Sequence, residues 1–232
     1  IWVSDPFHES FIDMFEGKLS IFDCYDEYTS LGGLPIIRTK QQIQIHEKKL
    51  LQKANITFVV SDVLYKGKST YANRISILPN AADVRHFRPL LGSELRVPSD
   101  IATVPKPIIG YLGGLSNLVD IPLLCMLAEK HPEWSFVSIG SKMNRFREYV
   151  AFKNLILKGN VHVLGFRPYE QLPYYINIFD VCLLPLITDH PFNIHCSPLK
   201  MYEYLATGKP IVSTDIPHVR RFSSVIRIGK NA

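Results

Sequence analysis

Short apolar runs alternate with segments of helical spacing through the first third of the chain. The apolar runs, which predict strands, are residues 19–25, 56–60 and 74–78. Between the first two, residues 40–54 place Ile43, Leu50, Leu51 and Ala54 at helical spacing, and Ser61 with Asp62 opens a second helix or turn. A β-α-β-α-β order is typical of a parallel sheet.

This alternation fails over residues 81–105, where prolines and mixed charges predict an irregular crossing, and then resumes to the end of the chain. The later strands are predicted at 107–112, 134–140, 161–164, 180–186, 210–214 and 224–228, and helices at 121–131, 144–152 and 169–179. We therefore expect an α/β protein with two doubly wound, Rossmann-like domains. The predicted ranges are 1–88 for an incomplete first domain, 89–105 for the linker and 106–232 for the second domain.

Residues 197–215 (SPLKMYEYLATGKPIVSTD) predict one more helix and the strand that follows it. Ser197 suits an N-cap, Pro198 the first turn and Gly208 a left-handed stop. Glu203 lies on the flank of the predicted apolar stripe, where it either pairs with Lys200 on the surface or reaches into a cleft. The stripe itself consists of Leu199, Tyr202, Leu205 and Ala206.

Composition narrows the function classes. The chain has 232 residues, 47% of them hydrophobic, and a formal charge of +5. Its basic residues are dispersed, with no zinc-finger spacing or aromatic RNA-binding pattern, so nucleic acid is not the expected partner. No apolar run approaches the roughly 20 residues that span a bilayer. Four separated cysteines favour reduced thiols in a cytoplasmic protein, and the absence of an initiator Met predicts a fragment.

Several catalytic classes lack their motifs. No Ser-His-Asp, G-x-S-x-G or Walker A pattern occurs. Gly113 and Gly114 follow a predicted strand and suit either a phosphate contact or a tight turn. The next strand ends at residues 140–142 (GSK) without the carboxylate that a nicotinamide ribose requires, which argues against a dehydrogenase. His190 and His195 have no third ligand in register, so no metal site is predicted.

The order of four segments resembles the GT-B glycosyltransferases of family 4, which are retaining and use nucleotide sugars. The segments are residues 79–89 (PNAADVRHFRP), 108–114 (IIGYLGG), 160–186 (NVHVLGFRPYEQLPYYINIFDVCLLPL) and 197–215. Within this family the chain resembles bacterial teichuronic-acid and exopolysaccharide glycosyltransferases, which share the strand end at residues 23–27 (DCYDE). The resemblance implies an acceptor-side domain at 1–88, a donor-binding domain at 106–232 and a cleft between them. It also implies a glycosyltransferase of cell-surface polysaccharide or glycoconjugate synthesis.

The resemblance also implies roles for residues of the donor domain. Glu203 corresponds to the second Glu of the family's E-x7-E motif and would bind the nucleotide ribose. The positions implied for the diphosphate and sugar are Gly113, Gly114, Ser197, Pro198, Leu199 and Lys200, and those implied for the nucleobase are Gly165 and Phe166. The implied partners are a nucleotide-diphosphate sugar and a sugar or lipid-linked acceptor, with no metal or other cofactor and possible peripheral association with the cytoplasmic membrane face.

Two positions depart from the family pattern. His195 stands where the motif has its first Glu, which commonly faces the donor sugar or the reaction centre. As a candidate catalytic residue His195 would hydrogen-bond a sugar hydroxyl; the alternative is that it only marks a subgroup of the family. The basic pair after the first donor-domain strand is absent, and Lys200 or Lys142 is expected to supply the cation. Asp26, at a predicted strand end, is the candidate catalytic residue of the first domain, or else a turn Asp. The alternatives are a non-catalytic nucleotide-sugar-binding module and a GT-B nucleotide-sugar epimerase.

Overall fold

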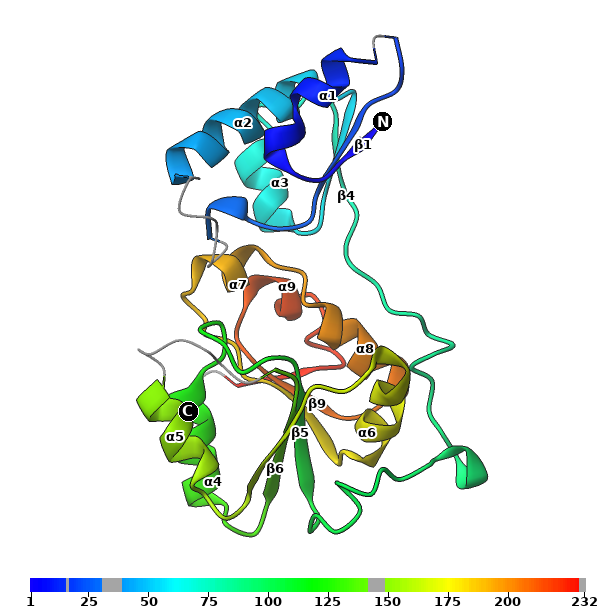
Figure 1. Cartoon of the computed structure of the whole chain (residues 1–232), viewed down its shortest axis with the longest axis vertical. Coiled ribbons are helices and arrows are strands. Elements are labelled where there is room, and N and C mark those ends of the chain that lie inside the picture. Colours follow the sequence, from blue (N-terminus) through cyan, green and yellow to red (C-terminus); the bar gives the residue numbers. More distant parts are fainter. Residues whose placement is uncertain (16, 31–38, 142–148, 230–232) are drawn as a thin grey trace. The chain divides into compact units, whose positions relative to one another are not determined.

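The computed structural model describes residues 1–15, 17–30, 39–141 and 149–229. Contacts divide the chain into two units, the first made of Ile1–Asn80 with Asp189–Ser197 and the second of Ala81–Thr188 with Pro198–Ala232. Each unit contains one parallel sheet (Figure 1). This division differs from the predicted domain ranges, because residues 81–105 group with the second unit and residues 189–197 with the first.

The first unit has a four-stranded parallel sheet in the order β1-β2-β3-β4. Its strands are β1 (Trp2–Val3), β2 (Ile21–Cys24), β3 (Ile56–Val59) and β4 (Ile75–Ile77), and its helices are α1 (Ser10–Asp13), α2 (Lys40–Lys53), α3 (Asp62–Lys68) and α7 (Pro191–His195). A capping box between Thr39 and Gln42 starts α2, whose apolar face joins a buried core with Phe22 and Val59.

The second unit has a six-stranded sheet in the order β10-β9-β8-β5-β6-β7, with every neighbouring pair parallel. Its strands are β5 (Ile108–Leu112), β6 (Ser135–Ile139), β7 (Val161–Gly165), β8 (Val181–Leu184), β9 (Ile211–Thr214) and β10 (Arg227–Gly229). Its helices are α4 (Ile121–Lys130), α5 (Tyr149–Ile156), α6 (Leu172–Ile178), α8 (Leu199–Thr207) and α9 (Pro217–Arg220). This strand order is that of the Rossmann fold. Helices α4 and α5 cover one face of the sheet and α6 and α8 the other (Figure 1).

The last predicted helix is present, but two details of its prediction are wrong. Its N-cap is Pro198, whereas the Ser197 hydroxyl accepts a hydrogen bond from the Asn80 main-chain N–H at 3.3 Å. Gly208 ends the helix at φ 69° as predicted. The predicted apolar stripe is not the buried face, because packing against the sheet and α6 buries Met201, Glu203, Tyr204 and Thr207 and leaves Leu199 half exposed.

The sequence pattern also missed a helix. No helix is predicted between residues 186 and 197, but Pro191–His195 forms α7, and His190 caps it because its Nδ1 accepts a hydrogen bond from the Phe192 main-chain N–H. Helix α7 packs on α3 within the first unit. The four cysteines lie within the described residues, and none of them belongs to a disulfide. In the part of the chain that the structure describes, no helix has the length and apolar character needed to span a membrane.

A buried hydrogen bond joins α8 to the central strand β5. The Leu112 main-chain N–H donates to the Tyr204 hydroxyl oxygen at 2.6 Å, and the Tyr204 side chain is fully buried. Leu112 is the last residue of β5, and α8 carries Lys200 and Glu203. The bond therefore fixes the helix at the end of the strand where the sheet meets the loops.

We expect Tyr204→Phe to destabilise the second unit, because it leaves the buried Leu112 N–H without an acceptor. The expected loss in the free energy of unfolding is about 1–3 kcal/mol, measured by urea unfolding. Tyr65→Phe removes an exposed hydroxyl and should change the free energy by less than about 0.5 kcal/mol. Equal effects of the two substitutions would contradict a structural role for the Tyr204 hydroxyl.

Candidate functional site

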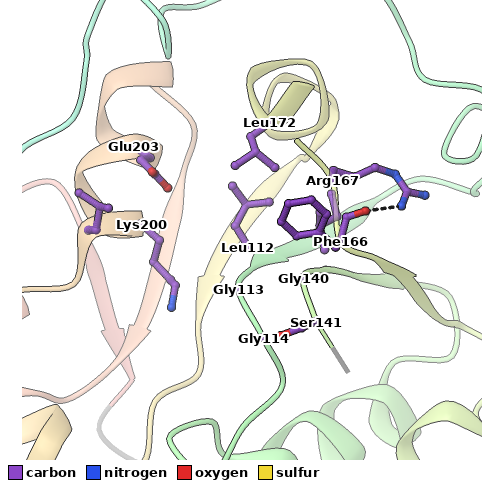
Figure 2. A pocket seen from close by; sticks show the side chains of 12 residues that line it. Leu112, Gly113, Gly114, Gly140, Ser141, Phe166, Arg167, Leu172, Lys200 and Glu203 are labelled. Carbon is purple, nitrogen blue, oxygen red and sulfur yellow. Dashed lines mark hydrogen bonds between the residues drawn. The ribbon is translucent and has the colours of Figure 1, made fainter. Parts of the chain in front are cut away.

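The second unit contains a pocket of about 330 Å³ where the strand order reverses. Strand β5 lies between β6 and β8, and the connections that follow β5 and β8 run in opposite directions, to β6 and to β9. Ligands bind at such points in doubly wound sheets. The pocket is lined by the ends of β5 and β6, the loop after β7, and α8 (Figure 2). The lining residues are Leu112, Gly113, Gly114, Ile139, Gly140, Ser141, Phe166, Arg167, Leu172, Leu199, Lys200 and Glu203.

Two glycines allow the floor of the pocket to form. A Cβ atom on Gly140 would lie 2.3 Å from the Gly113 carbonyl carbon and 2.7 Å from the Gly114 nitrogen. Gly113 and Gly140 have φ angles of 137° and 152°, which L side chains rarely adopt. The backbones after β5 and β6 therefore approach each other closely, and the floor presents main chain to any ligand.

Lys200 places a positive charge above this floor. Its Nζ donates to the Tyr111 hydroxyl at 3.4 Å, lies 5.1 Å from the centre of that ring, and would be 3.0 Å from a Cβ on Gly113. Lys200 forms no ion pair with any carboxylate that the structure describes. The ammonium group is thus available to an anion at the glycine turn.

Glu203 is the buried acid of the pocket, with a relative exposure of 7%. Its carboxylate makes no hydrogen bond with another described residue. Burial raises its pKa, while Lys200 and His86 act in the opposite direction. Figure 2 shows the carboxylate directed from α8 into the pocket. An acceptor held in this way suits a ligand that brings its own hydroxyl donors.

The facing wall is apolar and carries an exposed aromatic ring. Phe166 follows Gly165 at the end of β7 and remains 74% exposed, and Leu112 and Leu172 lie beside it (Figure 2). The Arg167 guanidinium donates to the Phe166 carbonyl oxygen at 2.7 Å. An exposed ring beside an apolar surface suits the face of a planar group such as a nucleobase.

The structure brings together six of the twelve residues predicted from the sequence. These are Gly113, Gly114, Phe166, Leu199, Lys200 and Glu203. Gly165 directly precedes the Phe166 wall, and Pro198 caps α8. Lys142 lies outside the described residues. His195, Ser197 and Asp26 belong to the first unit.

Asp26 follows β2 in the first unit and is half buried. Burial raises its pKa to about 6. Its carboxylate has no hydrogen bond or ion pair with another described residue. His195 ends α7, where its Nδ1 donates to the Pro191 carbonyl at 2.7 Å, and its Nε2 has no hydrogen bond with another described residue. Each side chain thus retains a polar atom without a hydrogen-bond partner among the described residues.

Three charged side chains of the first unit, two of them buried, contact one another and were not expected from the sequence. Lys68 Nζ contacts Glu47 at 2.5 Å and Glu27 at 3.4 Å, and the side chains of Lys68 and Glu47 are less than 10% exposed. The sequence does contain a signal for Glu47, because it occupies the apolar stripe of α2, four residues after Ile43 and three before Leu50. An acid at such a position requires a buried partner.

The pocket residues missed from the sequence are Ile139, Gly140, Ser141, Arg167, Leu112 and Leu172. Gly140 and Ser141 could have been found, because a glycine at the carboxyl end of a predicted strand marks a close backbone approach. Among the residues that the structure describes, no group of three His, Cys, Asp or Glu side chains is placed to hold a metal ion.

We expect Glu203→Gln to stabilise the ligand-free second unit by about 1 kcal/mol at pH 7. The pKa of Glu203 is raised above its ordinary value of 4.5, so the folded state binds the proton more tightly than the unfolded state. The ionised carboxylate therefore lowers stability above the raised pKa, and the benefit of Gln should disappear as the pH falls below about 4.5. Urea unfolding at several pH values measures this.

Glu94→Gln is the matched control, because Glu94 pairs with Arg88 in the same unit and its pKa is lowered by the Arg88 hydrogen bond. It should give no stabilisation at pH 7. A Glu203→Gln protein that is no more stable than wild type at pH 7 would contradict an unpartnered carboxylate.

Comparison with known proteins gives the family. A sequence profile described as "Glycosyl transferases group 1" matches residues 106–232. TuaH of Bacillus subtilis (strain 168), whose name assigns it to teichuronic acid biosynthesis as a glycosyltransferase, is 24% identical over 227 residues, which are 94% of this chain and 55% of TuaH. The chain thus spans about half the length of this relative.

Solved structures of GT-B glycosyltransferases share the fold. Sucrose-phosphate synthase from Thermosynechococcus elongatus matches with a TM-score of 0.70 at 18% identity, over 93% of this chain and 55% of the synthase. Anabaena HepE in complex with UDP and glucose matches with a TM-score of 0.64 at 18% identity, over 91% of this chain and 56% of HepE. The expected GT-B fold is confirmed. Because the family profile covers more than half of the sequence, the chain belongs to the group 1 glycosyl transferases.

Proposed function

We propose that the chain binds a nucleotide-diphosphate sugar in the pocket of its second unit, for transfer of the sugar to an acceptor hydroxyl. The observation that carries the proposal is the buried, unpartnered Glu203 carboxylate, which faces the Phe166 wall (Figure 2). Family membership and the names of relatives such as TuaH support a role in the synthesis of a cell-surface polysaccharide or glycoconjugate.

Each part of a nucleotide sugar has a matching surface in the pocket. The ribose hydroxyls would donate to Glu203, and the base would lie against Phe166. The diphosphate would lie over the glycine turn at Gly113, within reach of Lys200. The main-chain amides at the start of α8 face the same region and favour anions.

The chemistry breaks the bond between the anomeric carbon and the diphosphate oxygen, and the electron pair of that bond stays on the diphosphate. The oxygen of the acceptor hydroxyl forms the new bond to the anomeric carbon and gives up its proton. Negative charge develops on the leaving diphosphate, and the Lys200 ammonium and the helix-end amides stabilise it. We propose that no metal or other cofactor takes part, and that the anomeric configuration is retained as in the family that the sequence resembles.

Asp26 and His195 are the groups proposed for the acceptor and the transferred sugar. The Asp26 carboxylate, whose pKa is raised by burial to about 6, can accept a hydrogen bond from an acceptor hydroxyl once it is ionised. The free Nε2 of His195 can accept one from a sugar hydroxyl. A lipid-linked acceptor at the cytoplasmic face of a membrane is the proposed context, and the net charge of +5 favours an anionic surface.

We expect Lys200→Ala to weaken the binding of a nucleoside diphosphate by about tenfold to a hundredfold, because it removes a charged hydrogen-bond donor worth roughly 1.5–3 kcal/mol. Isothermal titration with UDP, ADP, GDP and dTDP measures this. Lys130→Ala, at an exposed position in the same unit, is the control. Lys142→Ala tests the alternative cation. Unchanged affinity in both Lys200→Ala and Lys142→Ala would contradict a lysine at the diphosphate.

The products distinguish the three candidate activities. With wild-type protein and a nucleotide-sugar donor, release of free nucleotide with a glycosylated acceptor supports transfer. An epimerised donor would indicate an epimerase instead. Binding of the donor without any product would indicate a non-catalytic module.

A further inference from the structure

Arg167, Tyr175 and Asp100 form a closed triangle of hydrogen bonds beside the pocket. Arg167 Nε donates to the Tyr175 hydroxyl oxygen at 2.9 Å, and that hydroxyl donates to Asp100 Oδ1 at 2.9 Å. The Arg167 guanidinium also forms an ion pair with Asp100. Their side chains are partly buried, with exposures of 25% for Arg167 and 31% for Asp100, while Tyr175 is buried.

The contacts between Asp100, Arg167 and Tyr175 keep the Asp100 carboxylate and the Arg167 guanidinium charged. Burial acts against the charge of Asp100, but hydrogen bonds from Arg167 and Tyr175 lower its pKa overall. The hydrogen bond to Asp100 raises the pKa of Arg167. Both groups are therefore charged at neutral pH and compensate each other.

The guanidinium has one further partner, and it is the main chain of the pocket wall. Arg167 NH1 donates to the Phe166 carbonyl oxygen, which ties the Phe166 peptide group to the triangle (Figure 2). Without that bond, Phe166 would be an exposed ring on a loop that turns through Gly165 at φ 81°. A loop of this kind loses conformational freedom when a ligand orders it, and a wall that is already ordered avoids that loss.

We propose that Asp100 is a positioning residue for the nucleobase: through Tyr175 and Arg167 it holds the Phe166 carbonyl and ring in place before the nucleotide binds. The inference rests on the proposed function of the pocket. Arg167 lines the pocket, but its charge is compensated by Asp100, so it is not the cation of the diphosphate. The pocket thus separates a base-facing wall, held by Asp100, from a phosphate-facing floor, served by Lys200.

The test compares a nucleoside diphosphate with inorganic pyrophosphate, because the two share the phosphates and differ by the nucleoside. The probe is whichever of UDP, ADP, GDP and dTDP binds wild-type protein most tightly. In Asp100→Asn and in Arg167→Lys, we expect the dissociation constant for that nucleotide to rise about tenfold, and that for pyrophosphate to change less than about twofold. Lys200→Ala should weaken the binding of both probes.

Asp180→Asn is the control for a merely structural effect. Asp180 lies just before β8, at the opposite end of the strands, and binds Lys106 and the Ile108 main-chain N–H. It should lower thermal stability without a selective loss of nucleotide affinity. Equal losses for nucleotide and pyrophosphate in Asp100→Asn, or no loss for either, would overturn the inference while leaving the proposed function intact. Wild-type protein that binds none of the four nucleotides would overturn the proposed function itself.

Discussion

The hydrogen bond between the Leu112 N–H and the Tyr204 hydroxyl holds the two halves of the pocket together. Leu112 leads directly into the glycine turn of the floor, and Tyr204 adjoins Glu203 on α8. The glycine turn and α8 are both needed to bind a nucleotide. The turn supplies main chain for the phosphates, and α8 supplies the Lys200 cation and the Glu203 carboxylate. One buried bond thus sets the distance between the glycine turn, which is proposed for the phosphates, and Glu203, which is proposed for the ribose.

Charge in the pocket is divided among three side chains in different states. Lys200 has no carboxylate partner among the described residues, Glu203 is buried without a donor, and Arg167 is compensated by Asp100. Glu203 lowers the stability of the empty pocket, since a buried carboxylate without a hydrogen-bond partner costs free energy. Groups that destabilise the empty pocket and match a ligand are expected at a binding site.

Much of the fold could be predicted from the sequence, because the strands are short, apolar and regularly spaced. Strand positions such as 108–112 and 181–184 follow from that pattern, and the stop at Gly208 follows from its backbone freedom. The buried face of α8 could not be predicted, because it depends on how the helix packs against α6 and β5. The Asp100–Tyr175–Arg167 triangle was also invisible, since its members are up to 75 residues apart.

Neither of the two units is a continuous segment of the chain. Helix α7 belongs to the first unit although second-unit segments flank it in sequence, and residues 81–105 belong with the second unit. A donor domain cut out by the limits of the family profile, at residue 106, would lack Asp100 and would carry α7 with its α3-facing surface uncovered. A self-sufficient donor domain would instead begin near residue 81 and replace residues 189–197 with a short polar bridge.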